Sequence, residues 1–146
     1  MDKENIERLT ALFNDINLAV LSTQKDGQPY ASLVAYSASK DLKDLFFLTS
    51  IATRKYENLQ ACRKVALLIH SAENLPDDFT QAVSVTALGT AEPVTDKDNY
   101  LKAFLERHPG LSDFSTDPDT ALIAVDVASY VIVDQFQNVK KVRMDN

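Results

Sequence analysis

Apolar residues in the first third of the chain follow first a helical and then a strand-like pattern. Ile6, Leu9, Leu12 and Phe13 recur at three- and four-residue spacing, which predicts an amphipathic helix near the N-terminus. Segments 17–24 and 30–38 are short and apolar or alternating, and a turn containing an Asp-Gly pair joins them. A further turn leads into the apolar segment 45–50. Three strands joined by short turns predict an antiparallel meander.

The remainder of the chain contains more predicted strands than helices. Segments 64–71 and 82–94 have the composition of strands, and Gly89 marks a bulge or a close approach in the second. A helix is predicted over 95–110, because four apolar side chains share one face and Pro109-Gly110 ends the pattern. Segment 121–135 predicts one long strand or two joined by a bend, and 139–144 predicts a short one. Segments 72–81 and 111–120 are expected to be loops.

The order of these elements predicts a mainly β fold in a single domain, residues 1–146. Six to seven mostly antiparallel strands and three helices are expected. The strands follow one another without regular strand–helix alternation, which disfavours a doubly wound parallel sheet. We therefore predict a small closed or nearly closed β-barrel with peripheral α-helices.

Composition narrows the classes of partner. The chain has 146 residues, of which 45% are hydrophobic and 25% charged, and its net charge is -6. An acidic chain is poorly suited to bind nucleic acid, because affinity for nucleic acid comes mainly from neutralising phosphates. No apolar run has the length of a membrane span, and the N-terminus lacks the apolar segment of a secretion signal. With Cys62 as its one cysteine, the chain is expected to be cytoplasmic and to bind no membrane.

Most motifs of enzyme chemistry are absent from the sequence. It contains no glycine-rich phosphate loop and no nucleophile elbow. His70 and His108 are isolated, so no metal site is predicted. Cys62 has no partner pattern that would activate a nucleophile, and a thiol on a helix face is the preferred interpretation. No residue is predicted to be catalytic.

The stretch FFLTSIATRKYENL, residues 46–59, carries the clearest chemical signal. Thr53, Arg54 and Lys55 stand at the start of a predicted helix, where cations are unfavourable unless an anion is present. A hydroxyl, free backbone N–H groups and two cations at a helix start can together bind a phosphate. The alternative is a solvated Arg-Lys pair that interacts with Glu57 or Glu73.

Three stretches in this order resemble the pyridoxamine-phosphate-oxidase-like family of FMN-binding split barrels. They are LAVLSTQKDGQPYASLVAY, the Thr-Arg-Lys stretch after the strand end Phe47–Ser50, and VSVTALGTAEPV. The resemblance implies a split β-barrel, FMN as the cofactor, and a homodimer with two flavins at its interface. It also implies a set of cofactor-binding residues: Thr53, Arg54 and Lys55 at the FMN phosphate, Thr49 on the ribityl or phosphate side, Ser32, Leu33 and Val34 facing the isoalloxazine ring, and Ser84 approaching the flavin across the dimer interface.

The sequence also departs from the family pattern. The true pyridoxamine-phosphate oxidases carry Arg and Lys where this chain has Ser32 and Ser37, and the C-terminus lacks the His that B6 oxidases and haem-degrading relatives use. The resemblance therefore implies an FMN-binding oxidoreductase that passes electrons between a reduced nicotinamide or small substrate and an acceptor. The alternative is a non-catalytic carrier or sensor of flavin or a related cofactor, such as a deazaflavin or haem. In either case the flavin, rather than the protein, supplies the redox chemistry.

Overall fold

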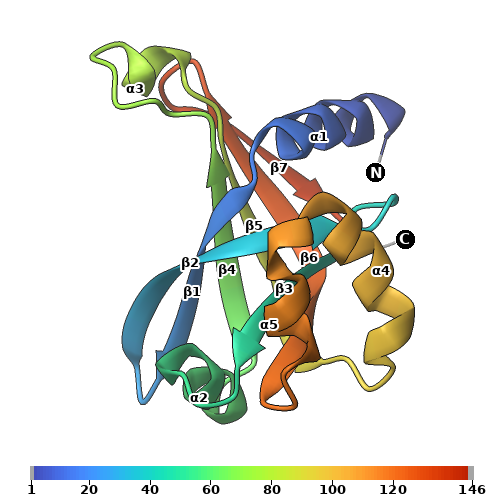
Figure 1. Cartoon of the computed structure of the whole chain (residues 1–146). Coiled ribbons are helices and arrows are strands. Elements are labelled where there is room, and N and C mark those ends of the chain that lie inside the picture. The colour runs from blue at the N-terminus through green and yellow to red at the C-terminus, as the bar shows by residue number, and fades with distance from the viewer. Residues whose placement is uncertain (1, 145–146) are drawn as a thin grey trace.

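A closed antiparallel β-barrel forms the centre of the molecule (Figure 1). The structure, a computed structural model, describes residues 2–144. Six strands follow one another around the barrel in the order β3-β2-β1-β4-β5-β6, and pairing of β3 with β6 closes it. These strands are β1 Leu18–Lys25, β2 Gln28–Ala38, β3 Asp44–Ser50, β4 Lys64–His70, β5 Ser84–Pro93 and β6 Thr120–Asp134. The prediction of a mainly β fold with a split barrel is confirmed.

The last strand lies outside the barrel. Segment β7, Asn138–Arg143, pairs only with the second half of β6, from Ser129 to Asp134. The first half of β6 pairs with β3, and most of its length pairs with β5. Segment 121–135 thus forms one continuous strand with three neighbours, which settles the choice between one strand and two.

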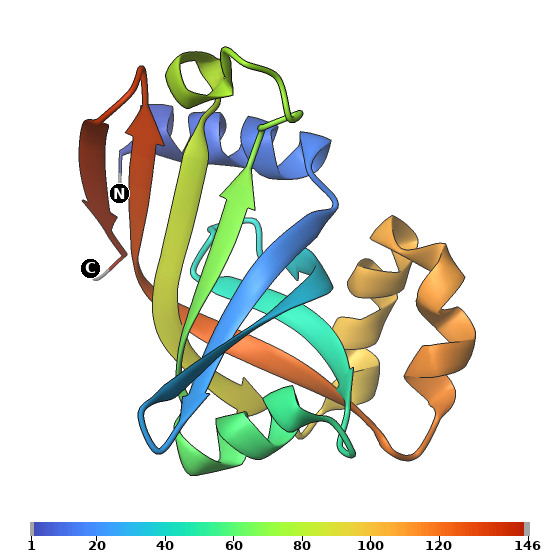
Figure 2. The ribbon, with the colours of Figure 1, turned by 90° about the vertical axis from the view of Figure 1, so that its left-hand side faces the viewer.

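Three longer helices surround the barrel at the predicted positions. They are α1 Lys3–Asp15, α2 Arg54–Ala61 and α4 Lys97–Arg107. Leu9 and Phe13 of α1 and Leu59 of α2 enter the main core, so these two helices lie over the ends of the barrel. Helix α4 covers β3 and β6 from outside through a second cluster that contains Leu48, Phe104 and Leu122 (Figure 2).

Two segments that we expected to be loops contain short helices. Segment 72–81 includes α3, Asp78–Gln81, and segment 111–120 includes α5, Ser112–Thr116, which follows the 3₁₀ turn η1, Pro109–Leu111. Elements of three to five residues are too short to show a helical repeat of apolar positions. Among residues 2–144, no helix is long and apolar enough to cross a membrane.

Gly89 occupies the bulge that its position in a strand predicts. The pairing of β5 with β6 shifts register between Leu88 and Gly89. A Cβ atom at Gly89 would lie 2.3 Å from the carbonyl oxygen of Asp126 and 2.9 Å from Cγ1 of Val125. The close approach of β6 therefore requires glycine at this position.

The barrel opens between β2 and β3. These strands pair only over Tyr36–Ala38 and Leu45–Phe47, and beyond this short ladder they diverge. Residues 28–35 of β2 pair with β1 alone, and residues 48–50 of β3 pair with β6 alone. One edge of β2 is thus left without a neighbouring strand, and β3 leads from the divergence into α2.

Candidate functional site

Helix α2 begins one turn after β3 ends, and hydroxyl groups organise this junction. Thr53 is the N-cap, and its Oγ1 accepts a hydrogen bond from the backbone N–H of Tyr56 at 3.3 Å. The same hydroxyl donates to the carbonyl of Ser50 at 2.8 Å and lies 3.0 Å from Oγ1 of Thr49. The local sequence therefore fixes where the helix starts, and it brings the predicted residues Thr49 and Thr53 together.

Two backbone donors at the start of α2 remain available for a ligand. The N–H of Tyr56 is bonded to the Thr53 side chain, and the N–H of Glu57 is bonded to the Thr53 carbonyl. The N–H groups of Arg54 and Lys55 have no partner among residues 2–144. Free N–H groups at a helix start bind anions, because the partial positive charge of the helix is concentrated there.

The two cations beside these N–H groups carry no ion pair. Arg54 is exposed and lies over the ring of Tyr30, with its guanidinium carbon 5.5 Å from the ring centroid. Lys55 is half-buried, and neither cation is bonded to a carboxylate in the described part of the chain. The solvated-pair alternative expected Glu57 to interact with these cations. Glu57 accepts a hydrogen bond from Lys25 at 2.5 Å, which is the main cause that lowers the pKa of its carboxyl, and the charge of Arg54 lowers this pKa further.

Tyr30 and Lys25 were not singled out as site residues by the sequence pattern. With Arg54, Glu57 and Asn58 they line a hollow of about 330 Å³ between the β1–β2 hairpin and α2. Both views place α2 beside the tip of this hairpin (Figures 1 and 2). Tyr30 stands at the end of the KDGQPY turn, and an aromatic residue at that point was the available signal for a contact with a cation.

The three predicted residues on β2 do not share one face. Ser32 pairs with Leu21 and Val34 with Ala19, so both point toward the barrel interior, whereas Leu33 is 64% exposed on the outer face. The Ser32 hydroxyl is buried and has no hydrogen-bond partner among the described residues. A buried hydroxyl without a hydrogen bond lowers the stability of the fold unless a ligand supplies the missing bond. Because strand side chains alternate, the free edge of β2, rather than all three side chains, is the feature that could lie along a ring.

Ser84 lies far from the start of α2 within one protomer. It pairs with His70 at the end of β4, whereas α2 leads into the opposite end of that strand. Ser84 lines a hollow of about 500 Å³ together with Phe79 and Phe136, whose rings stack edge-to-face. A single protomer therefore does not bring Ser84 to the other predicted residues, and a role for Ser84 requires a second copy of the chain.

Both histidines have one ring nitrogen engaged. Nδ1 of His70 accepts a hydrogen bond from the N–H of Ala72 at 3.1 Å, and Nε2 of His108 lies 2.7 Å from the carbonyl oxygen of Tyr36. Within residues 2–144, no three His, Cys, Asp or Glu side chains form a group that could hold a metal ion. Cys62 is the C-cap of α2 and is half-buried.

Residues 6–134 match the model of the pyridoxamine 5'-phosphate oxidase family, and the chain belongs to this family. This confirms the resemblance seen in the sequence. No curated protein sequence matches the chain.

Solved structures with the same fold differ in the functions that their names give. The heme binding protein from Mycobacterium smegmatis superposes with a TM-score of 0.82 at 18% identity, covering 98% of this chain and 59% of that one. General stress protein 26 from Bacillus anthracis has a TM-score of 0.75 at 16% identity, covering 97% and 99% of the two chains. HutZ, the heme storage protein from Vibrio cholerae, has a TM-score of 0.71 at 18% identity, covering 83% and 88%. The chain thus spans about three fifths of the mycobacterial protein. At these identities the similarity shows the fold.

Proposed function

We propose that the chain binds FMN and acts as a flavin-dependent oxidoreductase on a small-molecule substrate. The observation that carries the proposal is the start of α2, where two free N–H groups and two unpaired cations stand beside the opening of the barrel. When bound, the flavin supplies the transfer of hydride or electrons between a reduced nicotinamide or small substrate and an acceptor. The protein's part is to bind and orient the group.

The described residues fit the parts of FMN in order. Arg54 and Lys55, with their own N–H groups, would hold the phosphate, and Thr53 and Thr49 would lie beside it. The free edge of β2 at Ser32–Val34 would lie along the ring, with its backbone groups available as donors and acceptors. Arg54 would leave the ring of Tyr30 when it turns toward the phosphate.

The experiment is a titration of the purified protein with FMN, followed by flavin absorbance and fluorescence. The variant Arg54→Ala/Lys55→Ala is expected to weaken binding on the order of 10²- to 10⁴-fold, because each charge-assisted hydrogen bond contributes about 1.5–3 kcal/mol. Arg63→Ala/Lys64→Ala is the matched control, since it removes an adjacent exposed Arg-Lys pair at the other end of α2. Protein that gains no flavin absorbance refutes the cofactor, and equal weakening in both variants refutes the phosphate site.

A second measurement separates an enzyme from a carrier or sensor. Bound FMN is mixed with NADH or NADPH, and its reduction and reoxidation are compared with those of free FMN. Reduction and reoxidation faster than in free FMN support the oxidoreductase. Binding without faster turnover supports the carrier or sensor instead.

Haem is the second candidate cofactor, because two of the structures with the same fold are named as heme binding and heme storage proteins. To bind the iron, a histidine would have to lose an existing hydrogen bond or move its ring proton from one nitrogen to the other. His70 accepts through Nδ1, which puts the proton of the neutral ring on Nε2. His108 would lose its contact with the Tyr36 carbonyl. FMN requires neither change, and the absorbance spectrum of the protein as isolated distinguishes the two cofactors.

We further propose that the chain forms a homodimer through the outer face of β1, β2, β4 and β5. The register places Leu33, Val20, Leu68 and Thr86 in one row across these strands, and Leu18 and Leu88 extend the row into an apolar patch. Exposed apolar patches of this kind mark interaction sites. Ser84, the predicted residue from the partner, lies on the same outer face, in register with His70.

Sedimentation tests the dimer with two matched variants. Leu88 on β5 and Phe114 on α5 are both 38% exposed, and only Leu88 lies on the proposed face. Leu88→Asp is expected to shift the protein toward monomer, and Phe114→Asp is expected to leave the dimer intact. A monomeric wild-type protein would exclude the dimer.

A further inference from the structure

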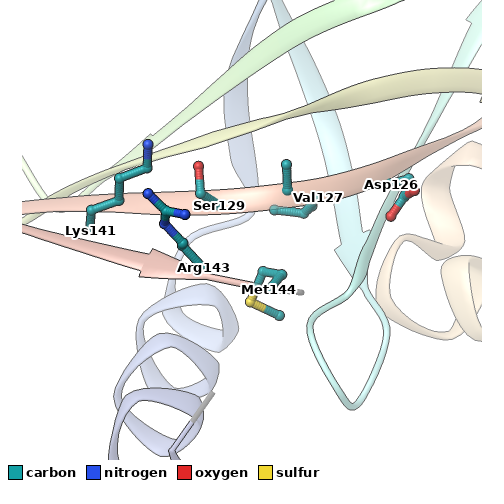
Figure 3. A pocket seen from close by; sticks show the side chains of 7 residues that line it. Asp126, Val127, Ser129, Lys141, Arg143 and Met144 are labelled. Atoms are coloured by element: carbon teal, nitrogen blue, oxygen red, sulfur yellow. The ribbon is translucent and has the colours of Figure 1, made fainter. Parts of the chain in front are cut away.

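A third hollow, also of about 500 Å³, lies on the strand pair β6–β7 (Figure 3). It is lined by Asp126, Val127, Ser129, Lys141, Arg143 and Met144. None of these residues belongs to α2, β2 or β3, so the hollow is built from elements that the proposed FMN phosphate site does not use. Its lining combines two cations and a hydroxyl with buried apolar side chains.

The two cations lie on the same face of β7. Lys141 pairs with Val131 and Arg143 with Ser129, so the side chains two residues apart point to one side. Figure 3 shows both extending over β6 on the side to which the Ser129 hydroxyl points. Neither side chain has a hydrogen bond or ion pair within residues 2–144. Both side chains are exposed, and an anion between them would reduce the repulsion of their like charges.

Ser129 provides an independent observation. The residue is 5% exposed, and its hydroxyl forms no hydrogen bond with the described part of the chain, while its oxygen keeps contact with solvent on the side of the hollow. Here the hydroxyl faces the hollow, beside the two cations (Figure 3). A ligand oxygen in the hollow would supply the missing bond.

We propose that the β6–β7 hollow is an anion site that binds the phosphate group of a small molecule. Arg143 offers a planar fork of donors, Lys141 a compact charge and Ser129 a hydroxyl, a combination that matches the several oxygens of a phosphate. Val127 and Met144 are 3% and 7% exposed and give the hollow an apolar floor for the body of the ligand. Asp126 at the other end repels a second negative group, so the phosphate lies at the Lys141 end.

The test follows backbone amide signals by NMR during titration with inorganic phosphate, with chloride at equal ionic strength as reference. It is run on the wild-type chain and on Arg54→Ala/Lys55→Ala, in which the proposed FMN phosphate site is removed. In both, the amides of residues 126–129 and 141–143 are expected to shift saturably. Saturable shifts in Arg54→Ala/Lys55→Ala do not depend on whether the chain binds FMN. The phosphate site in the hollow and the FMN site can therefore be refuted separately.

Variants of the hollow decide the outcome. Lys141→Ala/Arg143→Ala is expected to weaken phosphate binding at least tenfold, Ser129→Ala a few-fold, and Arg63→Ala/Lys64→Ala not at all. Shifts that do not saturate, that chloride reproduces, or that persist in Lys141→Ala/Arg143→Ala overturn the site. A loss of dimer in Lys141→Ala/Arg143→Ala without any phosphate response in the wild type also overturns it, and assigns the cations to carboxylates of a second copy.

Discussion

Two side chains from distant parts of the chain hold the end of α1, and replacing both is expected to cost more than the sum of the single replacements. The Tyr36 hydroxyl donates to the Ile16 carbonyl at 2.7 Å. The Arg107 guanidinium donates to the same carbonyl at 2.6 Å and to the Phe13 carbonyl. It also lies over the Tyr36 ring, 4.8 Å from the centroid. Both carbonyls lie at the end of α1, where the Phe13 carbonyl has only a long backbone bond from the Ile16 N–H, at 3.4 Å, and the Ile16 carbonyl has no backbone donor among the described residues.

The expected loss in the free energy of unfolding depends on which carbonyl keeps a hydrogen-bond partner in each variant. Tyr36→Phe leaves the Ile16 carbonyl bonded to Arg107, so the free energy of unfolding is expected to fall by about 1 kcal/mol. Arg107→Met removes two charge-assisted bonds and a cation–π contact while Tyr36 remains, for a loss of about 2–3 kcal/mol. The double variant leaves the Ile16 carbonyl without a partner among the described residues, and the Phe13 carbonyl with only the Ile16 N–H at 3.4 Å. Its loss is therefore expected to exceed the sum of the single losses by about 1 kcal/mol or more.

Urea unfolding of the wild type, both single variants and the double variant gives this coupling directly. Tyr130→Phe serves as the control, because its hydroxyl donates at 2.7 Å to the Leu42 carbonyl, which Arg107 does not contact. Tyr130→Phe and Arg107→Met are expected to add within about 0.5 kcal/mol. Additivity of Tyr36→Phe with Arg107→Met would show that the shared carbonyls do not couple the two side chains.

Three further outcomes follow from single positions. Gly89→Ala is expected to lose about 1–3 kcal/mol in thermal unfolding, because its Cβ would meet the Asp126 carbonyl at 2.3 Å; unchanged stability would show that β6 moves freely. Burial raises the pKa of Tyr36 to about 12, so the folded state binds this proton more tightly than the unfolded state does. The contribution of Tyr36 to the free energy of unfolding is therefore fully present below pH 10 and is lost between pH 10 and 12; a pH series of unfolding should show a smaller fall for Tyr36→Phe. Thr53→Ala should cost about 1 kcal/mol by loss of the α2 cap, whereas Thr53→Ser retains it; equal losses would argue against the cap.

The barrel could be predicted from the sequence because its strands are short, consecutive and separated by recognisable turns. The Asp-Gly turn, the alternation in segment 30–38 and Gly89 in segment 82–94 each left a local signal that the structure confirms. Closure of the barrel by β3 and β6 left no local signal in the sequence, since pairing of segments far apart in the chain depends on the whole fold. Helices α3 and α5 were missed for the opposite reason, because each is little more than one turn long.

The candidate site was only partly visible in the sequence. Arg54 and Lys55 could be found because two cations at a helix start conflict with the helix dipole. Tyr30 could not be assigned, because its contact with Arg54 depends on the hairpin lying beside α2. The proposed hollow at Lys141 and Arg143 was invisible, since alternating cations on an outer strand also occur where no ligand binds. The buried, unpartnered hydroxyl of Ser32 and the hydroxyl that Ser129 turns toward the hollow are results of packing, which no sequence pattern reports.

The closure of the barrel by β3 and β6 has a consequence for synthesis of the protein. Roughly 70 residues separate Ser50 at the end of β3 from Thr120 at the start of β6. At about 5–20 residues per second, a ribosome needs on the order of 4–14 s to make them. Throughout that time β3 has β2 on one side and an open edge on the other. The nascent chain therefore exposes an apolar strand edge, and occupancy by a chaperone is expected to end when residues 120–126 leave the ribosome.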